Sequence, residues 1–165
     1  VAEFWNTLTA LPIIAVGAAG MCMTARCRLG IELLACYLVV FVIGIGTLLF
    51  HLTLRREGQI LDELPMLWGS CLFIDATVCA ADTRLGSSVR RWVAPALGVY
   101  GAIAMVVYFT GGFERFLAMY IASVATLVFV AGRHAFVSVR MGTPLLQRQL
   151  IVAATLVYAG GFALL

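Results

Sequence analysis

The sequence predicts an all-α protein, a polytopic bundle of transmembrane helices. Of the 165 residues, 63% are hydrophobic and only 12% are charged, and the mean hydropathy is +1.05. Soluble domains hold roughly 45–50% apolar and about 25% charged residues, and a domain of this size cannot bury so much apolar surface. The apolar runs are long and do not alternate with polar residues, which argues against a membrane β-barrel. Together these observations predict six membrane segments.

The first two segments are bounded by polar and basic residues. One runs from about Thr7 to Met23, opened by Asn6 and closed by arginines. The other runs from about Gly30 to Leu52 and stops before Arg55. A bilayer core needs about 20 helical residues, so each segment can form one crossing.

The third segment is predicted to run from Pro65 to about Ala81. Asp62 and Glu63 come just before it, and a proline at the first helical position after acidic residues is a common helix start. On this prediction Asp62 lies in a loop.

The last three segments are separated by glycines and arginines. The fourth runs from about Trp92 to Thr110 and ends at Gly111 and Gly112. The fifth runs from about Phe116 to Val130, and the sixth begins near Gln149.

The arginines predict how the segments are oriented. All 11 basic residues are arginine, and eight lie in the loops after segments one, three and five. By the positive-inside rule these loops are cytoplasmic, so the N-terminus is expected in the lumen or outside. The net charge of +3 is therefore a topology signal and does not indicate a nucleic-acid partner.

Neither end of the chain has the features of a natural terminus. The sequence begins at Val1 without an initiator methionine and stops at Leu165 inside an apolar stretch. We therefore expect a fragment: one transmembrane domain over residues 1–165 that is incomplete at both ends.

Three polar residues near segments two and three form a candidate site. Thr47 and His51 are four residues apart and share one helix face, and a short loop returns the chain to Asp62 on the same side of the membrane. A metal-binding imidazole, a carboxylate that accepts a proton from water and a hydroxyl that stabilises an oxyanion suit metal-assisted hydrolysis. Structural alternatives stay open: Thr47 can bond its own helix carbonyl, Asp62 can cap a helix, and one histidine makes no zinc site.

Two blocks of sequence resemble the alkaline ceramidase family. Residues 50–54, FHLTL, followed by residues 59–66, QILDELPM, resemble that family's signature at its second and third helices. Residues 2–7, AEFWNT, resemble the family's segment just before its first helix.

The resemblance implies a seven-helix enzyme of sphingolipid metabolism that uses zinc to activate water in the membrane and hydrolyses ceramide to sphingosine and a fatty acid. In that family three histidines hold zinc: one matches His51, and the other two, an HxxxH pair at the last helix, are absent here. The family's oxyanion-stabilising serine matches Thr47, and the aspartate that holds or deprotonates the water matches Asp62. A calcium ligand of the family matches Glu3.

The resemblance also implies partners and location. We expect ceramide from the bilayer as substrate, no protein or nucleic-acid partner, and a multi-pass protein of the endoplasmic reticulum or Golgi with a lumenal N-terminus. The fragment itself is expected to be inactive.

His134 is expected in a cytoplasmic loop, away from His51. Asp75 is expected to pair with a polar group on another helix or to serve the substrate.

Two other functional classes remain open. One is a receptor-like or catalytically dead seven-helix homologue of the adiponectin-receptor type, which shares the same plan of polar residues. The other is a small transporter, for which Asp75 is the main support because intramembrane charges often mark transport pathways.

Overall fold

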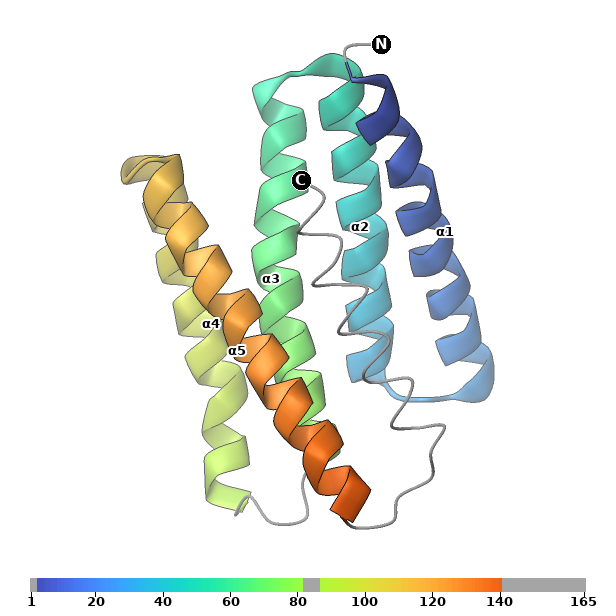
Figure 1. Cartoon of the computed structure of the whole chain (residues 1–165), viewed down its shortest axis with the longest axis vertical. Coiled ribbons are helices and arrows are strands. Elements are labelled where there is room, and N and C mark those ends of the chain that lie inside the picture. The colour runs from blue at the N-terminus through green and yellow to red at the C-terminus, as the bar shows by residue number, and fades with distance from the viewer. Residues whose placement is uncertain (1–2, 82–86, 141–165) are drawn as a thin grey trace. The chain divides into compact units, whose positions relative to one another are not determined.

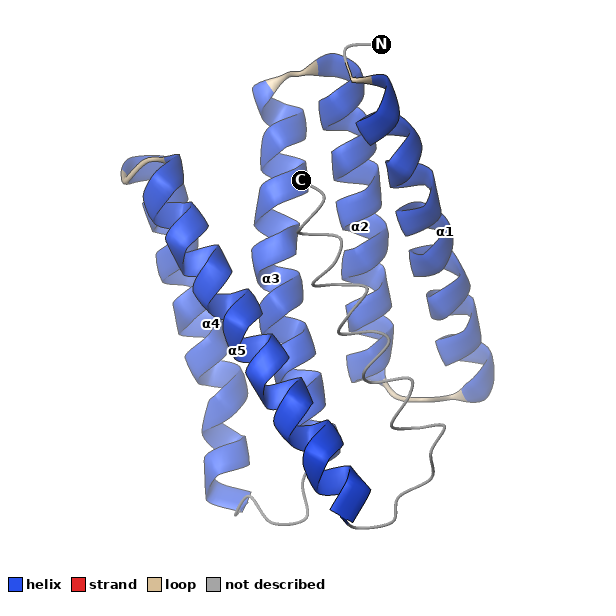
Figure 2. Cartoon of the chain, in the orientation of Figure 1, coloured by secondary structure: helices blue, strands red, loops and turns tan. Residues whose placement is uncertain are grey.

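The computed structural model describes residues 3–81 and 87–140, which form helices and short turns (Figures 1 and 2). In these ranges the helices are α1 (Phe4–Cys27), α2 (Ile31–Thr53), α3 (Arg56–Ala81), α4 (Ser87–Thr110) and α5 (Phe113–Arg140). The predicted all-α class is confirmed. The sixth predicted segment, which begins near Gln149, lies outside the described residues.

The chain divides into two compact units, residues 1–72 and 73–165. The first unit holds α1, α2 and most of α3, and the second holds the end of α3 with α4 and α5.

Glycines let α1 and α2 pack closely in the first unit. A Cβ atom added at Gly17 would lie 2.6–2.8 Å from the backbone and Cβ of Phe41, and one added at Gly44 would lie 2.8 Å from the backbone nitrogen of Ile14. These distances are shorter than any van der Waals contact. Helix pairs in membranes gain most of their stability from such close packing, because lipid tails are as apolar as the side chains they replace.

Two tight connections turn the chain back on itself in this unit. Arg28 ends α1 in the left-handed conformation at φ 52°, and Leu54 ends α2 in the same way at φ 50°. The Leu54 N–H donates to the carbonyl of Phe50 at 2.6 Å. Because only Leu54 and Arg55 separate α2 from α3, residues at equal distances from this turn lie opposite one another (Figure 1).

The third helix begins earlier than predicted. It starts at Arg56 rather than Pro65, so Asp62 lies inside the helix, and its predicted place in a loop and the alternative that it caps the helix are both wrong. The acidic Glu57 in the first turn favours this earlier start through the helix dipole. Pro65 is tolerated within the helix, although its missing N–H leaves the Leu61 carbonyl without the usual bond.

The second unit contains a helical hairpin with the predicted glycine turn. Gly112 joins α4 to α5 at φ 87°, a conformation that favours glycine. The Tyr100 hydroxyl of α4 donates to the carbonyl of Met119 in α5. The rings of Tyr108 and Phe116 meet edge to face, with centroids 4.8 Å apart.

The fifth helix is longer than predicted. It continues past Val130 to Arg140, so His134 is a helix residue and its predicted loop position is wrong. Charged and polar residues near its end mark the edge of the apolar stretch, but they do not break a helix. The hydropathy pattern therefore located the edge of the apolar stretch, and the helix itself ends later.

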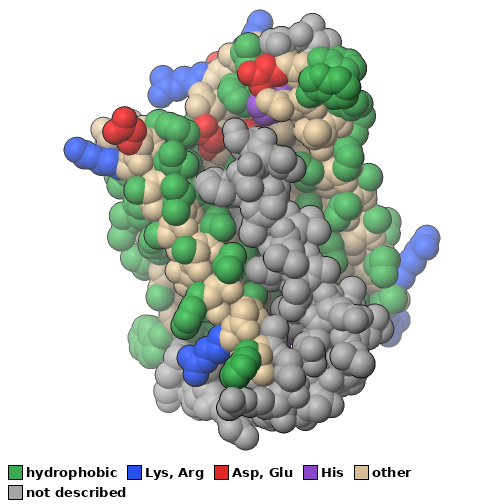
Figure 3. All heavy atoms as spheres, in the orientation of Figure 1, with side chains coloured by type: hydrophobic (Ala, Val, Ile, Leu, Met, Phe, Trp, Pro, Cys, Tyr) green, Lys and Arg blue, Asp and Glu red, His purple; other side chains and the backbone are tan. Residues whose placement is uncertain are grey.

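Four of the described helices are long and apolar enough to cross a membrane: Phe4–Cys27, Ile31–Thr53, Arg91–Thr110 and Phe113–His134. Their exposed side chains are often large and apolar, and Trp5 is 73% and Phe129 is 68% exposed. On the face shown in Figure 3, hydrophobic side chains cover the helices and charged side chains gather toward helix ends. The chain is therefore a membrane protein, and lipid covers its outward apolar side chains.

Replacing Gly17 with alanine should lower the free energy of unfolding by about 1–3 kcal/mol, the usual cost of overpacking. The new methyl group would press on the Phe41 backbone, which cannot move away without separating α1 from α2. Denaturant titration in detergent micelles measures the change. The matched control is Gly98→Ala in α4, where no described atom lies within 4 Å of the new Cβ. Equal loss of stability in both variants would contradict the prediction.

Candidate functional site

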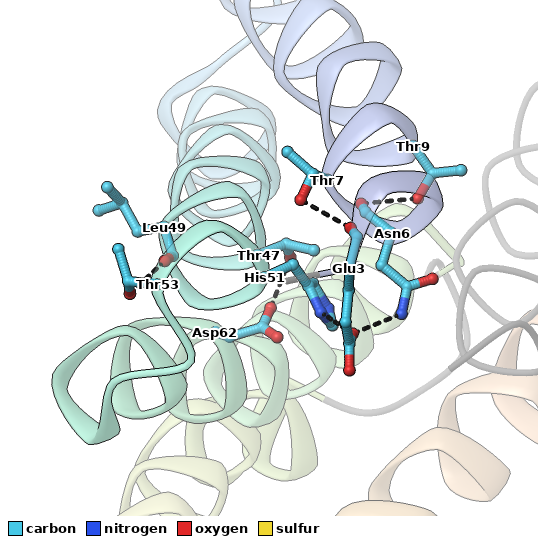
Figure 4. Close-up of polar contacts among 9 residues, drawn as sticks. All are labelled: Glu3, Asn6, Thr7, Thr9, Thr47, Leu49, His51, Thr53 and Asp62. Atoms are coloured by element: carbon cyan, nitrogen blue, oxygen red, sulfur yellow. Dashed lines mark hydrogen bonds and ion pairs between the residues drawn. The ribbon is translucent and has the colours of Figure 1, made fainter. Parts of the chain in front are cut away.

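The three predicted polar residues do meet, at one end of the first unit (Figure 4). Thr47 and His51 come from the last two turns of α2, and Asp62 comes from the second turn of α3. All three are buried, with 5–6% of their surface exposed. The short turn at Leu54 explains the meeting, because Thr47 and Asp62 lie about two helical turns from it on either side.

Thr47 binds the buried carboxyl group of Asp62. Its Oγ1 lies 2.5 Å from Asp62 Oδ1 and 2.9 Å from the carbonyl oxygen of Ile43. A hydroxyl carries one proton, so Thr47 donates to an ionised Asp62 or, when Asp62 is protonated and itself donates, to Ile43. The contact of Thr47 with a carbonyl of its own helix, one of the structural alternatives, is therefore present together with its contact to Asp62.

The environment of Asp62 shifts its acidity. Asp62 precedes the apolar stretch of α3, which begins at Pro65. Burial raises the pKa of Asp62 above its ordinary value, and the hydrogen bond from Thr47 works in the opposite direction. A carboxyl group with a raised pKa holds a proton more readily than an ordinary carboxyl group, which favours a role in proton transfer.

His51 is held by Glu3 from the start of the chain. Its Nδ1 lies 2.6 Å from Glu3 Oε2, and the two side chains point toward each other in Figure 4. An ionised carboxylate only accepts hydrogen bonds, so Nδ1 carries the proton and a neutral ring presents its lone pair at Nε2. That Nε2 atom is buried and has no hydrogen-bond partner among the described residues.

The contact between Glu3 and His51 was not predicted, since Glu3 was assigned only to calcium. Asn6 also donates to Glu3 Oε2, at 2.8 Å, and the hydrogen bonds from Asn6 and His51 lower the pKa of Glu3. The sequence did contain a signal for this contact. The first two segments have nearly equal lengths and a short loop between them, so residues just before the first lie beside residues at the end of the second.

A second polar pair lies beside the site on α3. Gln59 Nε2 donates to Glu63 Oε1 at 2.9 Å, while Glu63 Oε2 is buried without a partner among the described residues. No role of their own was predicted for Gln59 and Glu63. Their spacing of four residues in a helix is the signal that indicates the pair.

The described residues do not form a closed metal site. Within residues 3–81 and 87–140, no group of three or more histidine, cysteine, aspartate and glutamate side chains is placed to hold a metal ion. The donors that do fit a metal are the open Nε2 of His51 and the carboxylate of Asp62, because imidazole and carboxylate are normal zinc ligands.

The other two candidate residues belong to the second unit. Asp75 lies within α3 and makes no hydrogen bond or ion pair within the part of the chain that the structure describes. His134 lies in α5. The expected partner of Asp75 remains a prediction.

Comparison with known proteins gives consistent matches. The family model described as Ceramidase matches residues 1–164. Alkaline ceramidase 3 of Mus musculus is 36% identical over 108 residues, which is 66% of this chain and 40% of that protein. Alkaline ceramidase 1 of Homo sapiens is 33% identical over 100 residues, or 56% and 37% of the two chains. Alkaline ceramidase of Arabidopsis thaliana is 31% identical over 74 residues, or 45% and 29%. The chain spans less than half the length of each of these relatives.

Replacing Thr47 with valine should lower the free energy of unfolding by about 1–3 kcal/mol, because it leaves a buried carboxyl group without its partner. Valine keeps the shape of threonine, so the loss of the hydroxyl is the main change. The matched control is Thr110→Val, since among the described residues the Thr110 hydroxyl donates to the carbonyl of Val106 in its own helix. Denaturant titration compares the two variants, and an equal effect would show that the contact with Asp62 contributes nothing measurable.

Proposed function

Because the chain belongs to the ceramidase family, we propose that it forms part of a membrane amidase that hydrolyses ceramide to sphingosine and a fatty acid. The observation that carries this proposal is the buried set of Thr47, His51 and Asp62. This set combines a hydroxyl donor, an open imidazole nitrogen and a carboxyl group that can exchange a proton. These are the groups that amide hydrolysis needs at one place.

We propose that His51 holds a zinc ion through Nε2. The 2.6 Å contact with Glu3 supports this role, because metal-binding histidines usually donate their other ring N–H to a carboxylate that fixes the ring. When bound, zinc polarises the scissile carbonyl and lowers the pKa of a water molecule. Besides His51 the 165 residues contain one histidine, His134, so they alone are not expected to bind zinc tightly or to turn over ceramide.

Asp62 is proposed to accept the proton of the attacking water. As the water oxygen adds to the amide carbon, the proton passes to Asp62, which then becomes a donor to Thr47 over the 2.5 Å contact. Thr47 is thereby free to donate its own proton to the oxyanion that develops on the carbonyl oxygen. When the carbon–nitrogen bond breaks, Asp62 returns the proton to the leaving amine, and the products are sphingosine and a fatty acid.

Ceramide is proposed to reach the site from within the bilayer. Ceramide is nearly insoluble in water, and the site lies at the end of helices whose exposed side chains are largely apolar. The arginine distribution supports a lumenal position for this end. We therefore propose a protein of the endoplasmic reticulum or Golgi whose N-terminus and site face the lumen.

We also propose that Glu3 contributes to a calcium site. Glu3 Oε2 accepts the hydrogen bonds from Asn6 and His51, which leaves Oε1 for another ligand. The side chain of Glu3 is 44% exposed, so an ion can reach it, and carboxylate oxygen is a normal calcium ligand. Other ligands would have to come from outside the described residues.

Replacing Asp62 with asparagine, in protein expressed from the full reading frame, should reduce ceramide turnover by about 10²–10⁴-fold, the usual contribution of a proton-transferring group. Zinc content should persist at least in part. Release of fatty acid from labelled ceramide in mixed micelles measures turnover. Glu57→Gln is the matched control, since it removes one carboxylate from the exposed first turn of the same helix. Near-normal turnover in Asp62→Asn would contradict the proposed role, and no turnover in the unmodified protein would favour a receptor-like or inactive homologue.

Replacing His51 with alanine should abolish both zinc retention and ceramide hydrolysis. Elemental analysis of the purified protein measures the zinc-to-protein ratio beside the turnover assay. The control is His134→Ala, which removes the histidine in α5 and should leave both quantities unchanged. A normal zinc content in His51→Ala would refute the assignment of His51 as a ligand.

A further inference from the structure

Gly46 of α2 lies directly against the backbone of α3. A Cβ atom added at Gly46 would lie 2.7 Å from the backbone nitrogen of Asp62 and closer still to the carbonyl group of Leu61. No side chain is interposed at this point, so the two backbones are in contact. A side chain larger than hydrogen at position 46 must push α3 away, because the atoms that it would meet belong to the main chain.

The carbonyl group that meets Gly46 is the one that Pro65 leaves without its usual partner. In an α-helix the carbonyl of Leu61 accepts from the N–H four residues later, and Pro65 has none. A proline within a helix commonly bends it away from the ring and exposes that carbonyl. Here the exposed Leu61 carbonyl faces Gly46. Because glycine has no side chain, the carbonyl can approach α2 closely.

We propose that Gly46 and Pro65 are positioning residues that together set the contact between Thr47 and Asp62. Thr47 directly follows Gly46, and Asp62 directly follows Leu61, so the backbone contact and the 2.5 Å side-chain contact are adjacent on the same two helices. Any change that separates the backbones at Gly46 also separates the hydroxyl from the carboxyl group.

A second glycine, nearer the turn, supports the same arrangement. A Cβ atom at Gly58 of α3 would lie 2.8 Å from the Cα of Phe50 in α2. The helices are therefore in close backbone contact at two levels of α2, at Gly46 and one turn later at Phe50, so α2 and α3 approach along a short section rather than at one point. A local change at Gly46 acts on the end of that section where Asp62 lies.

This inference rests on the proposed catalytic role of Thr47 and Asp62. It predicts that Gly46→Ala, in protein expressed from the full reading frame, lowers kcat for ceramide by about 10²-fold, since a 1 Å displacement of a catalytic group typically has that effect. The KM and the zinc content should stay unchanged, because His51 and the apolar surfaces that meet ceramide are not altered. Gly98→Ala, which meets no described atom within 4 Å, is the control and should keep full turnover.

A second variant covers the case in which Gly46→Ala does not fold. Pro65→Ala adds no atoms at Gly46 and gives the Leu61 carbonyl an N–H partner within its own helix. The carbonyl should then turn toward residue 65 and carry Asp62 with it. The expected result is a kcat lowered by about tenfold or more without any loss of stability, because alanine is favoured over proline inside a helix. A purely structural role for Pro65 does not predict lower turnover in an equally stable protein.

A double-mutant cycle tests the geometry without any assay of function. If Gly46 sets the contact, Thr47→Val should cost much less stability in the Gly46→Ala background than in the unmodified protein, because the contact with Asp62 is already lost. An unchanged cost of Thr47→Val would overturn the inference, as would a kcat of Pro65→Ala within about twofold of the unmodified protein. Failure of the proposed function is seen separately, as normal turnover in Asp62→Asn.

Discussion

The burial of the Asp62 carboxyl group between two helices is the constraint on which the site depends. A carboxyl group with 5% of its surface exposed needs a hydrogen-bond partner, and Thr47 supplies it. That partner is within reach only where the backbones of α2 and α3 nearly touch, which Gly46 permits. The tight turn at Leu54 completes the arrangement, because it fixes which residues of the two helices face each other.

The membrane explains why these polar groups gather at one end of the first unit. The middle of each apolar helix meets lipid, where an unpaired polar group costs several kcal/mol, so polar side chains concentrate near the helix ends. The helices α1 and α2 have 24 and 23 residues, and their short connection returns the end of α2 to the start of α1. Glu3 thereby reaches His51 even though 48 residues of sequence separate them.

The chemistry of the site depends on which polar atoms of His51, Thr47 and Asp62 carry a proton. Glu3 accepts a hydrogen bond from the Nδ1–H of His51 and leaves Nε2 open, which is the form in which imidazole binds a metal. Thr47 has one proton for two acceptors, so its donation changes direction when Asp62 gains a proton. In the proposed hydrolysis, this change of direction couples proton transfer at Asp62 to donation by Thr47.

A helical membrane protein can be predicted from composition alone, since 63% apolar residues in long runs permit no soluble fold. The sequence also predicts which residue types could form the site, because Thr47 and His51 must share a helix face and Asp62 must return to the same side. The position of Asp62 within α3 and the contact of Glu3 with His51 are visible only once the helices are packed together. Periodicity and helix-start signals describe one helix at a time, and taken alone Pro65 indicates a helix start. The physical reason is that contacts between helices depend on how closely their backbones approach, and that distance is set by both helices together.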